Sequence, residues 1–282
     1  MNSTTVGLNR NTIDKFYTKE SVVNTCMQSI QQNLNISTDD LIIEPSAGNG
    51  VFIPHIKSIT QQYRFYDLEP EHPEITRQDY LLLPCNILKS EFKKIHVIGN
   101  PPFGRQSSMA IQFIKKSCGF CDSISFILPK SFKKESLKKA FHARFHLIFE
   151  MDLPDKSFLV NGVEYGVDTV FQIWEKKSDD RKMLEKVEPL HFAFVSKNDN
   201  PDISFRRVGV YAGKIDVDTE KSEQSHYFIK FDYPNNNNTL DQYVEKLKNV
   251  TFQHNNTVGP RSISKQELIR EFNRCLCLCL SL

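Results

Sequence analysis

The sequence predicts an α/β fold in which a doubly wound, mostly parallel sheet precedes a smaller, β-rich and helical C-terminal subdomain. Two observations predict the sheet. Short apolar runs alternate with segments of helical periodicity, and the first four runs end in polar or glycine-rich turns. The runs expected to form strands are 40–44, 63–67, 76–81, 95–100, 123–129, 146–151 and 166–174.

The length of 282 residues suffices for one large α/β domain with an appendage. We expect the polar segment 1–12 to be disordered and place the first domain at 13–178. The charged stretch 175–188 indicates a linker. Short strand-like runs and two closing helices then make 179–282 a separate C-terminal segment.

Composition excludes several classes of protein. Lys and Arg number 36 against 34 Asp and Glu, so the net charge of +2 does not itself indicate nucleic acid, and any basic surface must be local. No apolar run is long enough to cross a bilayer, and the N-terminus lacks the apolar core of a signal peptide. Seven cysteines, an odd number, indicate a reducing interior. We therefore expect a protein that is not secreted, is cytoplasmic (or nuclear in a eukaryote), and has no membrane partner.

A Phe-Tyr-Thr segment at 16–18 precedes the first predicted helix, whose apolar residues recur at helical spacing from Val22 to Leu34. Thr18 can cap this helix. Free N–H groups at a helix start offer a site for an anion such as a carboxylate. The alternative is a first helix that only packs on the surface. The candidate ligand-binding residues of this segment are Phe16, Tyr17 and Thr18.

The buried strand 40–44 ends at Glu44 and enters a turn of small residues before the next helix. Glycines in such a turn let the backbone approach a ligand closely. The pattern is neither a dinucleotide fingerprint nor a P-loop, and the acid before the turn favours a cationic or hydroxyl-bearing ligand over a phosphate. The candidate residues are Glu44, Pro45, Ser46, Gly48 and Gly50.

Two further acids follow strand ends. Asp67 lies about 20 residues beyond the glycine turn, where doubly wound folds hold ribose hydroxyls, and Glu69 is the reserve for that role. Asp79 lies toward the end of the next strand and can accept a hydrogen bond from an adenine amine. The alternative is that these acids simply face water at the strand ends.

The strand 95–100 ends in a rigid platform. Two prolines fix φ and remove two backbone donors, and an aromatic ring follows them. A planar ligand with an exocyclic amine can donate to the asparagine oxygen and a proline carbonyl while it stacks on the ring. Alone, this would be a proline-rich turn, but three acids on the same sheet edge indicate a site. The candidate catalytic residues are Asn100, Pro101, Pro102 and Phe103.

Substrate contacts are expected from three places. The stretch 130–139 has five lysines against one glutamate and begins at the same sheet edge, where a phosphate backbone can lie, although it can also be a solvated helix face. Phe158 is an exposed-aromatic candidate in a loop and can supply a second stacking surface opposite Phe103, or else anchor that loop in the core. The candidate residues are Lys130, Lys133, Lys134, Phe158, Arg206 and Arg207, with Arg261 nearby in the C-terminal segment.

Together these residues resemble the S-adenosylmethionine-dependent N6-adenine nucleic-acid methyltransferases. Residues 16–18 are similar to the N-terminal cofactor motif of that family, and 44–50 (Glu-Pro-Ser-Ala-Gly-Asn-Gly) are similar to its glycine motif. Residues 100–103 match its catalytic (D/N/S)-P-P-(Y/F/W) motif. The order, with cofactor motif before catalytic motif and recognition segment last, resembles the gamma arrangement and covers about 13–175.

The resemblance implies a Rossmann-like class I methyltransferase sheet, S-adenosylmethionine as cofactor and no metal. It further implies methyl transfer to N6 of a flipped adenine, in DNA rather than RNA, with 179–282 recognising the substrate. A protein partner or a homodimer is left open. The alternatives are adenine methylation of RNA, methylation of a protein glutamine amide, whose enzymes typically have Tyr after N-P-P, and a catalytically silent nucleic-acid-binding partner subunit. The intact Glu44, Gly48, Gly50, Asp67 and Asn-Pro-Pro-Phe argue against the silent partner.

Overall fold

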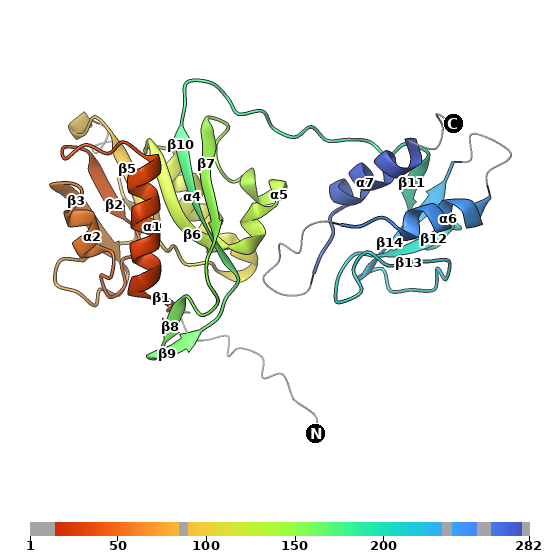
Figure 1. The fold of residues 1–282 in the computed structure, drawn as a ribbon, viewed down its shortest axis with the longest axis horizontal. Coiled ribbons are helices and arrows are strands. Elements are labelled where there is room, and N and C mark those ends of the chain that lie inside the picture. The colour runs from red at the N-terminus through yellow and green to blue at the C-terminus, as the bar shows by residue number, and fades with distance from the viewer. Residues whose placement is uncertain (1–14, 85–89, 233–238, 253–260, 278–282) are drawn as a thin grey trace. The chain divides into compact units, whose positions relative to one another are not determined.

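The computed structural model describes residues 15–84, 90–232, 239–252 and 261–277 (Figure 1). The segment expected to be disordered, 1–12, lies outside these ranges. The chain divides into two compact units, Met1–Lys182 and Met183–Leu282.

The first unit is built on a seven-stranded sheet. Only β10 runs antiparallel to its neighbours, β6 and β7, while the pairs from β4 to β6 are all parallel. The α/β class with a mostly parallel, Rossmann-like sheet is thereby confirmed. In spatial order the strands are β4 (Thr76–Arg77), β3 (Gln62–Asp67), β2 (Leu41–Glu44), β5 (Ile95–Gly99), β6 (Ser123–Pro129), β10 (Thr169–Lys176) and β7 (Phe145–Asp152).

Helices cover both faces of this sheet because its central strands are apolar on both sides. In β2, Leu41 and Ile43 join one hydrophobic core and Ile42 joins the other, as the alternation of side chains along a strand requires. α1 (Glu20–Asn33) and α2 (Ile53–Lys57) supply the core that contains Ile42. α4 (Ser108–Cys118) and α5 (Glu135–Lys138) lie over the other. The short 3-10 helices are η1 (Tyr80–Leu82), η2 (Arg105–Ser107) and η3 (Lys130–Lys133).

A small antiparallel sheet pairs the residues just before α1 with a hairpin that follows β7 in the chain (Figure 1). It contains β1 (Tyr17–Thr18), β8 (Phe158–Val160) and β9 (Val163–Tyr165), and Thr18 pairs with Phe158. The expectation that Thr18 caps α1 is wrong: the residue is extended strand, and Lys19 takes the N-cap position without a side-chain hydrogen bond.

The second unit has its own antiparallel sheet and core. Its strands lie in the order β11 (Phe192–Val195), β14 (His226–Phe231), β12 (Ile203–Arg206) and β13 (Ile215–Asp216), joined by α6 (Leu240–Lys248) and α7 (Lys265–Cys277). Ser264 and Glu267 form a capping box before α7, because Ser264 N donates to Glu267 Oε2 at 2.7 Å and Glu267 N donates to Ser264 Oγ at 3.3 Å. The small β-rich and helical C-terminal subdomain is therefore confirmed.

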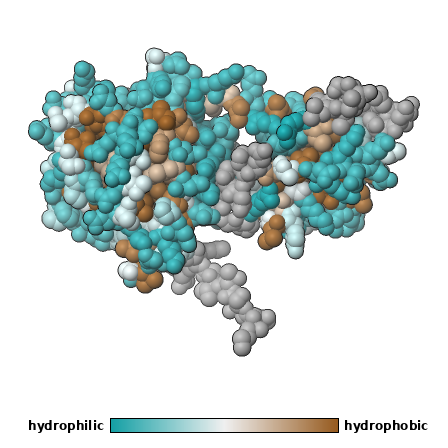
Figure 2. Space-filling view, viewed as in Figure 1, coloured by the Kyte–Doolittle hydropathy of each residue, from teal (hydrophilic) through white to brown (hydrophobic). Residues whose placement is uncertain are grey.

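The hydropathy of the surface can be followed in Figure 2. Figure 2 shows a face on which hydrophilic residues predominate and hydrophobic ones appear in separate groups. Within the described ranges, none of the helices has the length and apolarity needed to span a membrane.

Candidate active site

A cavity of about 380 Å³ opens at the carboxyl ends of β2, β3 and β5. The chain adds strands on one side of β2 and then crosses to the other at β5, which is the switch point where α/β sheets bind ligands. The sequence-predicted residues that line it are Phe16, Tyr17, Pro45, Ser46, Gly48, Asp67, Asp79, Asn100, Pro101, Pro102 and Phe103. The structure adds Lys15, Leu68, Gln78, Tyr80, Leu81, Met109 and Phe113, together with Glu69, the reserve acid.

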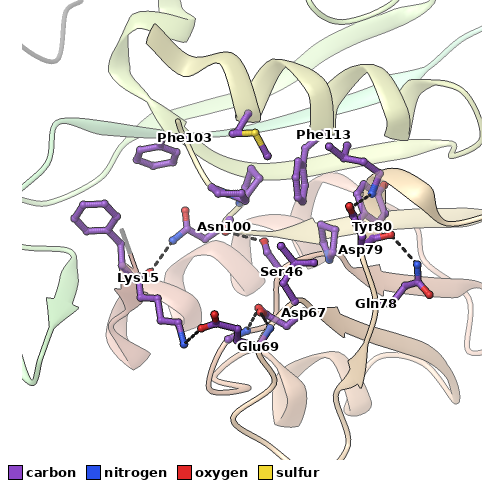
Figure 3. A pocket seen from close by; sticks show the side chains of 18 of the residues that line it. Lys15, Ser46, Asp67, Glu69, Gln78, Asp79, Tyr80, Asn100, Phe103 and Phe113 are labelled. Carbon is purple, nitrogen blue, oxygen red and sulfur yellow. Dashed lines mark hydrogen bonds and ion pairs between the residues drawn. The ribbon is translucent and has the colours of Figure 1, made fainter. Parts of the chain in front are cut away.

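Asn100 is held at two points in the cavity wall, between Phe103 and Ser46 in Figure 3. Its side-chain Nδ2 donates to the backbone carbonyl oxygen of Phe16 at 3.1 Å. The backbone carbonyl oxygen of Asn100 accepts from Ser46 Oγ at 2.9 Å. A carbonyl only accepts, so the amide nitrogen must face Phe16 and Oδ1 must face away from it. Oδ1 is buried and has no hydrogen-bond partner within the described chain. A buried acceptor left unpaired costs about 1–3 kcal/mol, and a ligand N–H would remove that cost.

Two aromatic rings flank this part of the cavity. The rings of Phe16 and Phe103 are nearly parallel, with centroids 6.4 Å apart and planes at 18°. Phe158, expected to be the exposed second ring, is fully buried, so that expectation is wrong. Strand alternation in β8 turns its side chain into the core, where it packs edge-on against Phe16 at 6.1 Å. Phe158 thus supports the ring that faces Phe103.

The two glycines of the turn after β2 have different structural roles. Gly48 lines the cavity with φ +54°, and its N–H donates to Asp67 Oδ2 at 2.8 Å. Gly50 is outside the described cavity lining. A Cβ on Gly50 would lie 2.8 Å from Ile53 Cδ1, and φ there is +82°. Gly50 is therefore favoured chiefly by the left-handed backbone of the turn, with a further close contact to His72 at 3.1 Å for any added Cβ.

Asp67 and Asp79 both reach the cavity while they hold its loops. Asp67 Oδ1 accepts from Glu69 N at 2.8 Å, so the carboxylate ties the glycine turn to the end of β3. Asp79 Oδ1 accepts from Leu81 N at 2.9 Å and caps η1. Each carboxylate oxygen can accept a second hydrogen bond, so both acids remain able to bind a ligand hydroxyl or amine.

Glu44 lies behind the cavity wall and is 1% exposed. Burial raises the pKa of its carboxyl well above the ordinary value, and the nearby charge of Asp67 raises it further. Its Oε2 atom has no hydrogen-bond partner within the described chain. Glu44 is not among the described residues that line the cavity, and its side chain lies beside Gly99, where an added Cβ would be 3.2 Å from Glu44 Cγ.

A charged network forms one rim of the cavity. Lys15 Nζ contacts Glu69 at 2.9 Å and Glu71 at 2.8 Å, and Tyr17 Oη donates to Glu71 at 2.5 Å. Burial and the hydrogen bond to Glu71 raise the pKa of Tyr17 to about 12. The hydrogen bonds from Lys15 and Tyr17 lower the pKa of Glu71. The N-terminal segment is thereby fastened to the loop after β3.

The remaining candidate residues lie elsewhere. Lys133 pairs with Asp152 at 2.9 Å, and Lys130 contacts the same carboxylate at 3.9 Å, so β7 neutralises part of the lysine cluster. Among the described lining residues there is no lysine of 130–134, nor Thr18. Arg206 and Arg207 belong to the second unit.

The known proteins that resemble this chain do so in structure. No protein-family model matches the sequence, and no curated protein matches it significantly. Among solved structures, a 23S rRNA methyltransferase is 13% identical and has a TM-score of 0.42, with 61% of this chain and 72% of that chain covered. A type I restriction-modification methyltransferase subunit from Streptococcus thermophilus is 15% identical, with 58% and 46% covered and a TM-score of 0.41. A dimethyladenosine transferase from Plasmodium falciparum is 10% identical, with 58% and 64% covered and a TM-score of 0.39.

Proposed function

We propose that the protein transfers a methyl group from S-adenosylmethionine to the N6 amine of adenine in nucleic acid, with DNA as the substrate. The observation that carries the proposal is the buried Oδ1 of Asn100, which has no hydrogen-bond partner among the described residues and lies near the Phe16 and Phe103 rings. An acceptor fixed next to a flat apolar surface suits a planar group with an N–H donor. The Asn-Pro-Pro-Phe sequence at 100–103, which resembles the catalytic motif of N6-adenine methyltransferases, supports the same proposal.

The cavity fits the proposed cofactor in size and in chemistry. Its volume lies within the range of about 300–1,000 Å³ that small-molecule sites occupy. Asp67 or Glu69 would hold ribose hydroxyls, and Asp79 would accept from the adenine amine of the cofactor. Tyr80, Leu81 and Phe113 supply apolar walls for a purine ring. Bound there, S-adenosylmethionine supplies a methyl group already activated on a sulfonium.

The residues of the chain would act on the substrate amine. The adenine amine is a poor nucleophile because its lone pair is delocalised into the ring. Hydrogen bonds from this amine to Asn100 Oδ1 and to the Pro101 carbonyl would localise the lone pair and orient it. Because the Phe16 carbonyl already holds the amide of Asn100, the acceptor needs no reorganisation when the substrate arrives.

A base within a duplex cannot enter such a cavity, so the adenine must be flipped out or supplied single-stranded. Stacking on Phe103 and on Phe16 would stabilise the extruded base by about 1–3 kcal/mol for each contact. Phe16 here replaces Phe158 as the proposed second aromatic contact, because Phe158 is buried.

The test is Asn100→Ala, assayed with labelled S-adenosylmethionine and separate DNA, RNA and protein substrates, followed by mass spectrometry of the nucleosides and amino acids. We expect the wild type to form N6-methyladenine in DNA and the variant to lose at least about 10²-fold in kcat, as removal of one preorganised polar group does. Cofactor binding, measured by calorimetry, should persist.

The matched control is Asn33→Ala, an exposed asparagine at the end of α1 whose amide also donates to a backbone carbonyl. It should leave turnover unchanged. Normal turnover by Asn100→Ala would refute the mechanism. Methylated glutamine without methylated adenine would instead assign the site to a protein amide.

A further inference from the structure

The turn between β12 and β13 exposes two adjacent large hydrophobic side chains. Val210 is 89% exposed and Tyr211 is 73% exposed. Single exposed apolar residues are common on protein surfaces, but a neighbouring pair at the end of a turn is a candidate contact surface. We call these two residues the Val210–Tyr211 tip.

The backbone of this turn is closed on itself. Gly213 N donates to the carbonyl of Arg206, and Arg206 N donates to the carbonyl of Lys214, both at 2.8 Å. Gly209 and Gly213 have φ of +100° and +104°, values that favour glycine. The tip therefore lies between two glycines whose left-handed backbone conformations form this turn.

The turn is also anchored to the body of its unit. Ala212 is 6% exposed and belongs to the hydrophobic core. Gly209 N donates to the carbonyl of Arg261 at 2.9 Å, which ties the turn to the segment before α7. A tip fixed in this way can contact a partner without a large loss of conformational entropy.

Basic residues flank the tip in the sequence. The stretch 206–214 contains Arg206, Arg207 and Lys214 and no acid. Arg207 donates to the carbonyl of Gln224 and lies over the Tyr227 ring at 5.4 Å. In the described part of the chain neither Arg206 nor Arg207 forms an ion pair, while Lys214 Nζ forms a long one with Asp216 at 3.9 Å. Lys133 differs from the two arginines in this respect, because it pairs with Asp152 at 2.9 Å.

We propose that the Val210–Tyr211 tip binds nucleic acid, with Tyr211 stacked on a base, Val210 packed beside it, and Arg207 and Lys214 on the flanking phosphates. Aromatic stacking next to cations is how proteins hold exposed bases, and apolar side chains also insert between base steps. A flat apolar base beside phosphates complements this surface in both shape and charge. The choice of ligand rests on the proposed function.

The test measures the affinity of the full chain for labelled adenine-containing oligonucleotides, as DNA duplex, DNA single strand and RNA, at 50 mM and 200 mM salt (about the range over which phosphate contacts weaken). Tyr211→Ala should raise the dissociation constant about tenfold, the size of one stacking contact, without changing the salt dependence. Tyr211→Phe should bind like the wild type. Arg207→Gln should lower the slope of log K against log salt by about one.

Val217→Ala is the matched control, because Val217 is 57% exposed in the same unit but lies between Asp216 and Asp218. It should leave the affinity unchanged. An unaltered affinity in Tyr211→Ala would overturn the proposal. So would a wild-type chain that binds none of the oligonucleotides, and the tip would then belong to a protein partner.

Methyl transfer measured on the same samples separates the two proposals. Binding that depends on Tyr211 without any transfer to nucleic acid would leave the tip in place and refute the proposed function. If the rate of methyl transfer to adenine, at substrate concentrations below saturation, is the same in Tyr211→Ala as in the wild type, the proposed role of the tip is refuted and the proposed function stands.

Discussion

Glu44, buried behind the cavity wall, is a residue whose charge opposes folding at neutral pH. Its carboxyl is buried at the end of β2, with Oε2 unpaired in the described chain and Asp67 nearby. Because burial raises its pKa in the folded state, the folded protein holds this proton at pH values where the unfolded chain has already lost it. Stability from this group is therefore fully present below its ordinary pKa of 4.5 and is lost as pH rises through the folded-state pKa.

Glu44→Gln should accordingly stabilise the protein at neutral pH, on the order of 1 kcal/mol, because an amide occupies the same space without a charge. The measurement is urea unfolding of wild type and variant at several pH values. The increase in unfolding free energy should grow from about pH 5 upward and vanish near pH 4, close to the ordinary pKa of a glutamate. The difference between the two proteins isolates Glu44, since burial lowers the pKa of His96 and gives the opposite slope.

Glu245→Gln is the control for Glu44, because the side chain of Glu245 is 76% exposed. It should change the unfolding free energy little at any pH. A Glu44→Gln variant that is less stable than the wild type at pH 7 would show that the carboxylate is ionised and stabilised by its surroundings.

The β8–β9 hairpin is the element that connects the N-terminal segment to the catalytic asparagine proposed above. β8 pairs with β1, and Lys19 forms an ion pair with Glu164 on β9. Phe16, which immediately precedes β1, accepts the hydrogen bond from Asn100. A loose hairpin should therefore let the asparagine amide rotate while the main sheet stays intact.

Gly162→Val tests this connection. Gly162 has φ +78° in an Asn-Gly turn, and a Cβ there would meet no atom within 4 Å, so the substitution acts on the backbone alone. We expect faster hydrogen exchange in β1, β8 and β9 and a several-fold lower kcat, with a loss of about 1 kcal/mol confined to the hairpin. Val163→Ala, at the next and 69% exposed position, is the control. Unchanged kcat despite faster exchange would separate the hairpin from the site.

Most of the large sheet could be predicted because its strands are short apolar runs with an acid, a glycine or an asparagine at the carboxyl end. The same rule placed Asp67, Asp79 and Asn100 on one edge, where the cavity lies. The hairpin could not be predicted, since three-residue strands carry too little periodicity to distinguish a buried Phe158 from an exposed one.

The far wall of the cavity escaped sequence analysis for a similar reason. Tyr80, Met109 and Phe113 have the spacing of ordinary core residues, and Tyr80 and Phe113 do belong to the core under the sheet. Nothing local marks an apolar side chain that packs on one side and lines a cavity on the other. The rim contact of Lys15 with Glu71 joins residues 56 positions apart, which only the folded chain brings together.

At the scale of the whole molecule, the two units carry different parts of the proposed function. Every described lining residue of the cavity lies between 15 and 113, within Met1–Lys182. The second unit has a separate hydrophobic core and carries the Val210–Tyr211 tip and its arginines. Cofactor chemistry and nucleic-acid affinity should therefore be separable.

A chain of residues 1–182 should fold, bind S-adenosylmethionine as tightly as the full protein, and lose at least about tenfold in affinity for adenine-containing oligonucleotides, because the proposed Tyr211 stacking contact and the phosphate contacts of Arg207 and Lys214 are removed. Calorimetry with the cofactor and fluorescence anisotropy with labelled DNA measure the two affinities on the same preparation.

Residues 183–282 alone should bind the oligonucleotide weakly and the cofactor not at all. A folded 1–182 chain that fails to bind the cofactor would show that the second unit completes the cavity. One that keeps full affinity for DNA would place the nucleic-acid surface on the first unit, where the lysines of 130–139 would be its source.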